Sequence, residues 1–390
     1  MSFEKSGEFY DRAVVIPGRS NTRSKAPGKF FDVGAGPLYA ARGRGSLLES
    51  VDGIPYVDML CGLGAISLGY GVIDPPVFEG VFSLPHYVEV LASEEILSHV
   101  AKWATRVRSV RTGSESTTAA MLIARRATGR RPIFVAKNAY HAWHPWAAFR
   151  DQPGTDGEWT FSYDYGSLAS VAKLVSEVGN PAAIVIEPAR WEETPTGYLA
   201  ALQAYAASLG SLFVVDEMIY GGRWRLGGAC ELYGLKPDLA CFGKAFGNGR
   251  PVAFLAGGDV LDRYGEFVSG TYSGDAGSLA TVVDVLAFYR DHDVVSALWE
   301  RGNHVAASLR QAISDAGVGG LHLEGAAVHQ RIRFEKPELG KVFSAELALR
   351  AFLWHPDVVN VSYSHTKRQI DRLGTAACES LVAMKARGEL

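Results

Sequence analysis

The sequence predicts an α/β fold, because short buried-strand patterns alternate with helical patterns through its middle. Five apolar runs bounded by turn residues are typical of strands buried on both faces, as in a parallel sheet. These runs cover residues 133–136, 183–187, 212–217, 239–243 and 252–258. Between several of them lie segments with helical spacing, and the first and last of these end in glycine, as helices often do. The helical segments cover residues 115–129, 167–179 and 199–210.

The length of the chain predicts more than one domain. A chain of 390 residues is longer than one hydrophobic core usually serves. Beyond residue 258 the buried-strand runs become fewer, and a long helical pattern at 276–290 leads into mixed segments. We therefore expect a large domain at residues 51–258 and a smaller one at 259–390, which an N-terminal segment at 1–50 joins.

Composition and charge argue against several classes of partner and site. The net charge of −3 gives no reason to expect nucleic acid or an anionic membrane as a partner. The four cysteines lack CxxC spacing, which argues against a zinc ribbon or a disulfide framework and fits a reducing compartment. The N-terminus is too polar for a signal peptide, and no apolar run is long enough to span a bilayer. We expect a cytoplasmic protein without a metal site.

Two carboxylates, Asp216 and Glu217, end one of the predicted strands. Open α/β sheets place ligands at the carboxyl ends of their strands, so these side chains are candidates for a binding site. A cap for the following helix or turn is the competing interpretation.

Lys244 follows another predicted strand, 28 residues after Asp216, so both side chains are expected at the same edge of the sheet. Glycines at 243, 247 and 249 leave room for the backbone to bend and for a flat ligand to approach. Most lysines at strand ends are solvated. Lys137, which also ends a predicted strand, lacks both the glycines and a carboxylate in register.

The stretch RTGSEST at residues 111–117 is a candidate anion site. Gly113 and Ser114 precede a helical segment, where backbone N–H groups and hydroxyls can bind phosphate. Ser114 as an ordinary N-cap, with Glu115 in the first turn, is the alternative.

These three features together fit one ligand with three parts. A phosphate at Gly113–Ser114, a protonatable ring nitrogen at Asp216 and a carbonyl that condenses with Lys244 are the parts of pyridoxal 5′-phosphate. A nucleotide-binding α/β protein would instead require a Walker or dinucleotide glycine loop, and RTGSES is neither.

Six stretches in order along the chain resemble the signatures of class III, fold-type I pyridoxal-phosphate aminotransferases. They are RTGSESTTAAMLIARRATGR, YHAWHPW, IEPAR, VVDEMIYGGRWR, PDLACFGKAFGNGRP and GTYSGD. Within this class, IPGRSNTRSKAPG, SLPHYVEV and VNVSYSHTKRQIDR resemble the glutamate-1-semialdehyde 2,1-aminomutase-like branch. The resemblance implies a large domain with a mainly parallel seven-stranded sheet flanked by helices, and a smaller α+β domain.

The resemblance also implies a role for each matching residue. Lys244 forms the Schiff base with the cofactor, Asp216 holds the ring nitrogen protonated, and the turn at Gly113 and Ser114 binds the phosphate. Tyr140 and Met218 cover the two faces of the ring, and Glu187 lies near the cofactor. Thr271 reaches the phosphate of the neighbouring subunit, which implies a homodimer with active sites at the interface. A core tyrosine at 140 and a helix cap at 187 are the competing interpretations.

Several positions depart from the family pattern. Arg111 stands where a small or polar residue is common, and Asp275 stands where asparagine is frequent. The other departures are Ala142, Pro145, Tyr220 and Gly222. All of them leave Lys244 and Asp216 in place, so they bear on the substrate and not on the cofactor.

The candidate residues for binding a substrate carboxylate are cationic. Arg19, Arg23 and Lys25 lie in the segment where the aminomutase-like branch supplies such a cation, and Arg223 and Arg250 flank the site. Solvation or surface pairing is the alternative for each of them.

We expect an aminotransferase that moves an amino group from an amino acid, glutamate in the first instance, to a keto or aldehyde acceptor such as a sugar or natural-product intermediate. An aminomutase of the glutamate-1-semialdehyde type is the first alternative. A non-catalytic protein with the same fold is the second.

Overall fold

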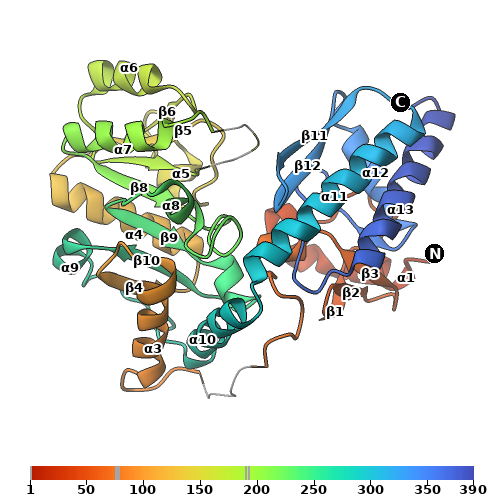
Figure 1. The fold of residues 1–390 in the computed structure, drawn as a ribbon, viewed down its shortest axis with the longest axis horizontal. Helices are drawn as coiled ribbons and strands as arrows, with labels where there is room; N and C mark the ends of the chain where they lie inside the picture. The colour runs from red at the N-terminus through yellow and green to blue at the C-terminus, as the bar shows by residue number, and fades with distance from the viewer. Residues whose placement is uncertain (1, 75–79, 189–190, 192–193) are drawn as a thin grey trace. The chain divides into compact units, whose positions relative to one another are not determined.

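The computed structural model describes residues 2–74, 80–188, 191 and 194–390. Its contacts divide the chain into two compact units. The central unit comprises Ile73–Val295, and the terminal unit comprises Met1–Val72 with Ser296–Leu390. Each unit is described by itself (Figure 1).

The central unit is built on a seven-stranded sheet with the strand order β4-β10-β9-β8-β7-β5-β6. Strand β10 is antiparallel to both of its neighbours, and the pairs from β9 to β6 are all parallel. The expected mainly parallel sheet of seven strands is confirmed. The strands are β4 (Arg106–Val110), β5 (Ile133–Ala136), β6 (Thr160–Tyr163), β7 (Ala183–Ile186), β8 (Leu212–Asp216), β9 (Leu239–Phe242) and β10 (Ala253–Gly257).

All five strands predicted from apolar runs are present, and they form the middle of the sheet. The two strands without such a run, β4 and β6, are its edges. Their sequences, RVRSV and TFSY, mix polar and apolar residues because an edge strand is only partly covered. The continuous-run signal therefore identifies interior strands and misses edge strands.

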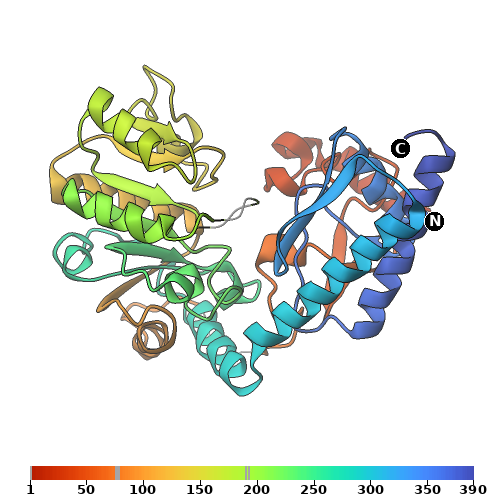
Figure 2. The ribbon, with the colours of Figure 1, turned by 45° about the horizontal axis from the view of Figure 1, so that its top comes forward.

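Helices cover both faces of this sheet (Figure 2). On one face, helices α3, α6, α7 and α10 pack against alternate strand residues such as Phe134, Ile184 and Phe213. On the other, α4, α5 and α9 pack against the intervening residues, such as Val135, Val185 and Val214. The helices are α3 (Tyr87–Glu95), α4 (Gly113–Thr128), α5 (Pro145–Ala148), α6 (Leu168–Val178), α7 (Tyr198–Ser208), α8 (Gly228–Tyr233), α9 (Asp259–Tyr264) and α10 (Ala276–Asp291), and a π-helical turn at Ile96–Val100 follows α3.

The units divide at residues 72 and 295, later in the chain than the residues 50 and 258 that the sequence led us to expect. The difference at the second boundary comes from α9 and α10. Helix α10 is buried along much of its circumference, with Leu279, Val282 and Leu286 in the core that covers the sheet. It therefore belongs with the sheet and not with the smaller unit.

The terminal unit combines residues from both ends of the chain. Its four-stranded sheet has the order β1-β2-β3-β13, and a separate hairpin pairs β11 with β12. The strands are β1 (Ala40–Arg44), β2 (Leu47–Ser50), β3 (Pro55–Asp58), β11 (Leu321–Ala326), β12 (His329–Phe334) and β13 (Phe352–Leu353). The helices are α1 (Glu4–Arg12), α2 (Cys61–Gly64), α11 (Val294–Ala316), α12 (Leu339–Ala348) and α13 (Lys367–Ala386), with 3₁₀ turns at Ala13–Val15, Pro17–Arg19 and Arg23–Lys25.

None of the helices in the described ranges carries an apolar stretch long enough for a membrane span.

Candidate active site

Six strands of the central sheet, β4 to β9, end at one edge. The ends of five of them, with the segments that follow, carry the predicted residues Gly113, Ser114, Tyr140, Glu187, Asp216, Met218 and Lys244. Strands β5, β7, β8 and β9 run parallel. Strand β4 runs in the same direction, because it is antiparallel to β10, which is itself antiparallel to β9. The turns that follow β4, β8 and β9 therefore lead from one edge, where α/β sheets bind ligands.

Lys244 follows β9 in a 3₁₀ turn, Lys244–Gly247. Its backbone has a φ of 42°, in the left-handed region that residues other than glycine seldom adopt. Burial lowers the pKa of its amine to about 8, although the charges of Asp216 and Glu187 act in the opposite direction. Arg223 lowers the pKa further. Lys244 is therefore a largely buried amine of reduced basicity among two carboxylates and a guanidinium.

Asp216 is the last residue of β8, and its carboxylate is held from both sides. His141 Nδ1 lies 2.9 Å from Asp216 Oδ2, and the backbone N–H of Met218 donates to Asp216 Oδ1 at 3.1 Å. Both side chains are buried, with exposed fractions of 0% for His141 and 5% for Asp216. The carboxylate is thus fixed in place at the strand end.

Glu217, the neighbouring carboxylate, has a different task. Its oxygens accept the backbone N–H groups of Ala229 at 3.0 Å and Cys230 at 2.6 Å, in the first turn of α8. Complete burial raises the pKa of Glu217 to about 7. Successive residues at a strand end point to opposite faces, so Asp216 is available to the site while Glu217 secures a helix. The cap interpretation holds for Glu217.

The predicted anion turn begins helix α4. Thr112, and not Ser114, is its N-cap: its hydroxyl accepts the N–H of Glu115, whose carboxylate in turn accepts the N–H of Thr112. This capping box leaves the N–H groups of Gly113 and Ser114 without an acceptor among the described residues. These two N–H groups are the part of the turn that can bind an anion.

Met218 joins the anion turn to the lysine turn. A methyl group placed on Gly113 would lie 2.9 Å from Met218 Sδ, and so would a methyl group placed on Gly243. Both glycines therefore allow the thioether to approach the backbone. The φ of Gly243 is 176°, so its role is close packing and not the bend that we expected there.

The remaining predicted residues of the central unit differ in their burial. Arg223 is completely buried and Glu187 is 9% exposed, and both charges act on Lys244. Tyr140 is 68% exposed, in the loop between β5 and α5, so it is not a core tyrosine. Thr271 and Arg250 are exposed.

The positions that depart from the family pattern pack in different ways. Tyr220 is buried against Trp224, with ring centroids 4.6 Å apart, and Gly222 has a φ of 71°, which favours glycine. Ala142 is buried, and Pro145 is the first residue of α5.

The candidate cations of the N-terminal segment belong to the terminal unit. Arg19 Nη1 donates to the carbonyl of Tyr10, and its guanidinium lies 3.9 Å from the centroid of that ring. Arg23 and Lys25 are exposed in a 3₁₀ turn. The contacts of Arg19 hold it within its own unit.

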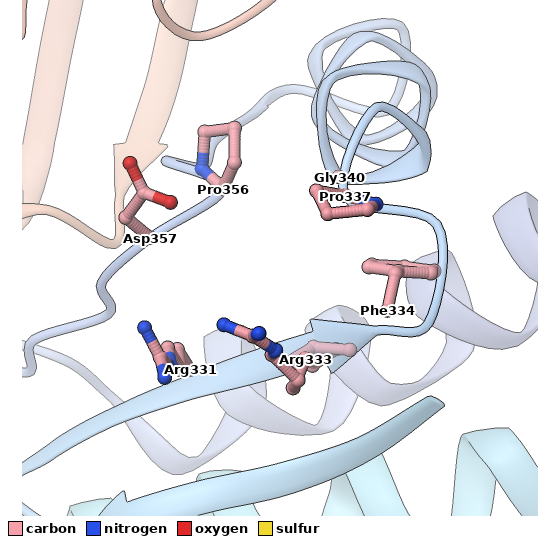
Figure 3. Close-up of a pocket in the computed structure, with 8 residues that line it drawn as sticks. Arg331, Arg333, Phe334, Pro337, Gly340, Pro356 and Asp357 are labelled. Carbon is pink, nitrogen blue, oxygen red and sulfur yellow. The ribbon is translucent and has the colours of Figure 1, made fainter. Parts of the chain in front are cut away.

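A small pocket in the terminal unit contains none of the predicted site residues (Figure 3). Arg331 and Arg333 line it from β12, with Asp357 opposite them. Arg331 Nη2 lies 2.6 Å from Glu324 Oε2, so its charge is already neutralised on the hairpin.

His141 is a site residue that was not predicted from the sequence. The signal was present, because His141 follows Tyr140 in the stretch YHAWHPW, five residues after a predicted strand. Its partner could not be predicted from the sequence, because His141 and Asp216 are 75 residues apart.

The assembled arrangement is suited to carbonyl–amine chemistry on an anionic ligand. It places a primary amine of lowered pKa near a buried carboxylate, and it places unused helix N–H groups at the same sheet edge. Such an amine is available as a nucleophile and as a proton carrier near neutral pH.

Comparison with known proteins gives consistent matches. A family model described as aminotransferase class-III matches residues 167–327. The glutamate-1-semialdehyde 2,1-aminomutase of Anaeromyxobacter sp. (strain Fw109-5) is 33% identical over 312 residues, which cover 72% of each chain. The 3-aminobutyryl-CoA aminotransferase of Cloacimonas acidaminovorans (strain Evry) is 27% identical over 384 residues, which cover 91% of each.

Among solved structures, the FumI protein of Sphingopyxis sp. MTA144 in its PLP internal aldimine form superposes with a TM-score of 0.90. The match covers 99% of this chain and 97% of that one at 24% sequence identity. At this identity the likeness establishes a shared fold.

Proposed function

Because the chain belongs to the class-III aminotransferase family, we propose that it is a pyridoxal 5′-phosphate-dependent aminotransferase with Lys244 and Asp216 at its centre. One observation carries the proposal. The buried amine of Lys244 has a lowered pKa and interacts electrostatically with Asp216, at the sheet edge where α4 begins. This arrangement serves a ligand that carries both an aldehyde and a phosphate.

The residues present fit the cofactor. The N–H groups of Gly113 and Ser114 would hold its phosphate, and the carboxylate of Asp216 would face its ring nitrogen. Met218 would cover one face of the ring and Tyr140 the other, with Glu187 beside it. The close approach of Met218 to Gly113 and Gly243 supports its part, since it lies between the phosphate turn and the lysine turn.

When bound, the cofactor supplies an aldehyde that condenses with primary amines and a protonated ring that accepts electrons from the substrate carbon. Lys244 Nζ then binds and delivers the proton that moves during the reaction. Its lowered pKa favours the neutral amine that proton uptake requires. Asp216, held by His141 and by the N–H of Met218, presents a fixed negative charge to the ring nitrogen.

We assign an amino acid, glutamate in the first instance, as the amino donor, and a keto or aldehyde compound as the acceptor. A sugar or natural-product intermediate fits the likeness to the aminomutase-like branch. Arg19, Arg23, Lys25, Arg223 and Arg250 are the candidates for binding a substrate carboxylate. Arg223 differs from the rest in being completely buried near Lys244, so its charge shapes the site whether or not it touches the substrate.

We also propose that the protein works as a homodimer. Thr271 is exposed in the loop between α9 and α10, where a neighbouring subunit can reach it. Its hydroxyl would complete the phosphate site of that neighbour.

An aminomutase of the glutamate-1-semialdehyde type is the second candidate, favoured by the 33% identity to a protein of that name. The two functions differ in stoichiometry. A transaminase consumes a separate amino donor and releases one keto product for each amine formed, whereas an aminomutase needs no second substrate for net turnover.

The test incubates the cofactor-loaded protein with glutamate, glutamine or alanine and a panel of keto and aldehyde acceptors. A transaminase releases the keto acid of its donor in step with the aminated acceptor. Conversion of glutamate-1-semialdehyde alone, with no keto acid released, would replace this proposal by the aminomutase. A protein that binds cofactor but turns over neither set would be non-catalytic. Lys244→Ala is the negative control for each assay.

A further inference from the structure

Arg108, on the edge strand β4, holds the segment that follows α9. Arg108 Nε donates to the carbonyl of Val268 at 2.6 Å, and its Nη2 donates to the carbonyl of Glu266 at 3.0 Å. These contacts secure the beginning of the loop at residues 265–275, which we call the threonine loop because Thr271 lies in its exposed middle.

The end of the threonine loop is held by Arg111. Arg111 Nη1 lies 3.3 Å from Asp275 Oδ1 and donates to Ser278 Oγ at 3.0 Å. Asp275 is the N-cap of α10, and the same Oδ1 accepts the N–H of Ser278 at 2.8 Å. Asp275 Oδ1 therefore caps the N-terminus of α10 and also forms the ion pair with Arg111, the residue that leads from β4 into the anion turn.

The surroundings of Arg111 repel its positive charge, and the carboxylate of Asp275 offsets this repulsion. Arg111 lies two residues before α4 and contacts the first turn of α10, so its cation is near the N-termini of two helices. A positive charge there is unfavourable, because the exposed N–H groups give that end of a helix a partial positive charge.

The pair between Arg111 and Asp275 is less exposed than a typical surface ion pair. Their exposed fractions are 25% for Arg111 and 21% for Asp275, so the pair is largely shielded from solvent. A neighbouring ion pair, Arg106 of β4 with Asp262 of α9, is 54% and 57% exposed. It provides a matched control that is far more open to solvent.

We propose that Arg111 and Asp275 form a positioning pair that fixes the end of the threonine loop beside the anion turn of the same chain. Retention of the cofactor phosphate, at this turn and through Thr271 in the neighbouring subunit, then depends on both charges together. The proposal rests on the proposed function for the identity of the ligand. It makes the two residues energetically coupled, because neither side chain forms the ion pair when its partner is neutral.

The test is a double-mutant cycle on the cofactor-loaded protein with Arg111→Asn, Asp275→Asn and both together. Asparagine at 275 still caps α10, so that variant removes the charge and leaves the cap. The quantity measured is the rate at which pyridoxal phosphate dissociates after dilution, followed by its absorbance at several salt concentrations.

Pyridoxal phosphate is expected to dissociate about fivefold faster from each single variant than from the wild type. The rate for the double variant should be about that of either single variant, because the second substitution removes no further interaction. Arg111→Lys, which keeps the charge, should recover most of the loss. Salt should speed dissociation from the wild type more than from the variants, since screening weakens only an existing ion pair. Asp262→Asn should leave the rate unchanged.

The inference would be overturned if the two substitutions changed the dissociation rate independently, so that their fold-changes multiplied in the double variant. An equal effect of Asp262→Asn, or unchanged rates in all variants, would also overturn it. A wild-type protein that holds no pyridoxal phosphate would overturn the proposed function instead. The unfolding midpoint of each variant, measured in parallel, distinguishes a displaced loop from a destabilised unit. Dissociation rates that rise only in proportion to the loss of stability would also contradict the proposed role of the pair.

Discussion

His141 Nδ1 lies 2.9 Å from Asp216 Oδ2, so a residue of the loop between β5 and α5 orients the carboxylate that ends β8. The imidazole is itself held in place. Thr117 Oγ1 donates to the carbonyl of His141 at 2.8 Å, and the ring of Trp146 stacks on the imidazole with an interplanar angle of 14°. The position of Asp216 is therefore determined by residues from three separate elements.

Replacement of His141 should weaken catalysis through Asp216. His141→Phe leaves one buried carboxylate oxygen without its donor, which costs roughly 1–3 kcal/mol, and kcat should fall about tenfold or more. His141→Asn retains an N–H and should lose less. The measurement is kcat and KM for the amino donor in both variants. A fall in activity that appears only as a raised KM, or equal losses in the two variants, would contradict this role.

The reaction of Lys244 with an aldehyde should follow a pKa near 8. Burial lowers the pKa of this amine from 10.5 to about 8. Below that pH the amine is protonated and cannot attack, so the rate of cofactor association should rise as pH increases through 8 and then level off. Stopped-flow absorbance on the cofactor-free protein between pH 6.5 and 10 measures this profile. A rate that still rises steeply above pH 9 would mean an amine of ordinary basicity.

Asp216→Asn provides a directional control for this profile. The negative charge of Asp216 raises the pKa of Lys244, so its removal should move the midpoint to lower pH. The same variant should lose most of its turnover, because a neutral amide cannot offset the charge of a protonated ring nitrogen. A midpoint that moves upward, or full activity, would show that Asp216 does not act on either group.

The role of Glu217 can be tested through the glycines at the two ends of α8. A methyl group on Gly228 would lie 2.2 Å from Glu217 Oε2, at a φ of 70°. Gly234 has a similar φ of 64° with no neighbouring atom within 4 Å. Gly228→Ala should therefore destabilise the protein by at least about 2 kcal/mol, and Gly234→Ala by about 1 kcal/mol. Urea unfolding compares them, and equal losses would remove Glu217 from the explanation.

Much of the central unit was predictable because its signals are local. Each buried strand is a continuous apolar run, and β5, β7, β8 and β9 lie within a residue of the runs that predicted them. Lys244 and Asp216 were identified because each comes directly after or at the end of such a run. Edge strands β4 and β6 escaped because exposure interrupts their apolar pattern.

The features that were not predicted depend on contacts between distant residues. The pairing of His141 with Asp216 and the pairing of Arg111 with Asp275 each join segments far apart in sequence. The complete burial of Arg223 likewise follows from the packing of the folded chain. The second domain boundary was placed too early because α10 reads as an ordinary helix until its packing on the sheet is known. The separate tasks of Asp216 and Glu217 likewise follow from the face on which each side chain lies.

The most direct test of the account is to identify the residue that borohydride attaches to pyridoxal phosphate. The loaded protein is reduced, digested and analysed by mass spectrometry, with Lys137, an exposed lysine after β5, as the internal comparison. The account predicts the phosphopyridoxyl group on Lys244 Nζ alone, and no stable label in Lys244→Ala. A label on another lysine, or an unchanged label in Lys244→Ala, would contradict the assignment of Lys244 and with it the proposed function.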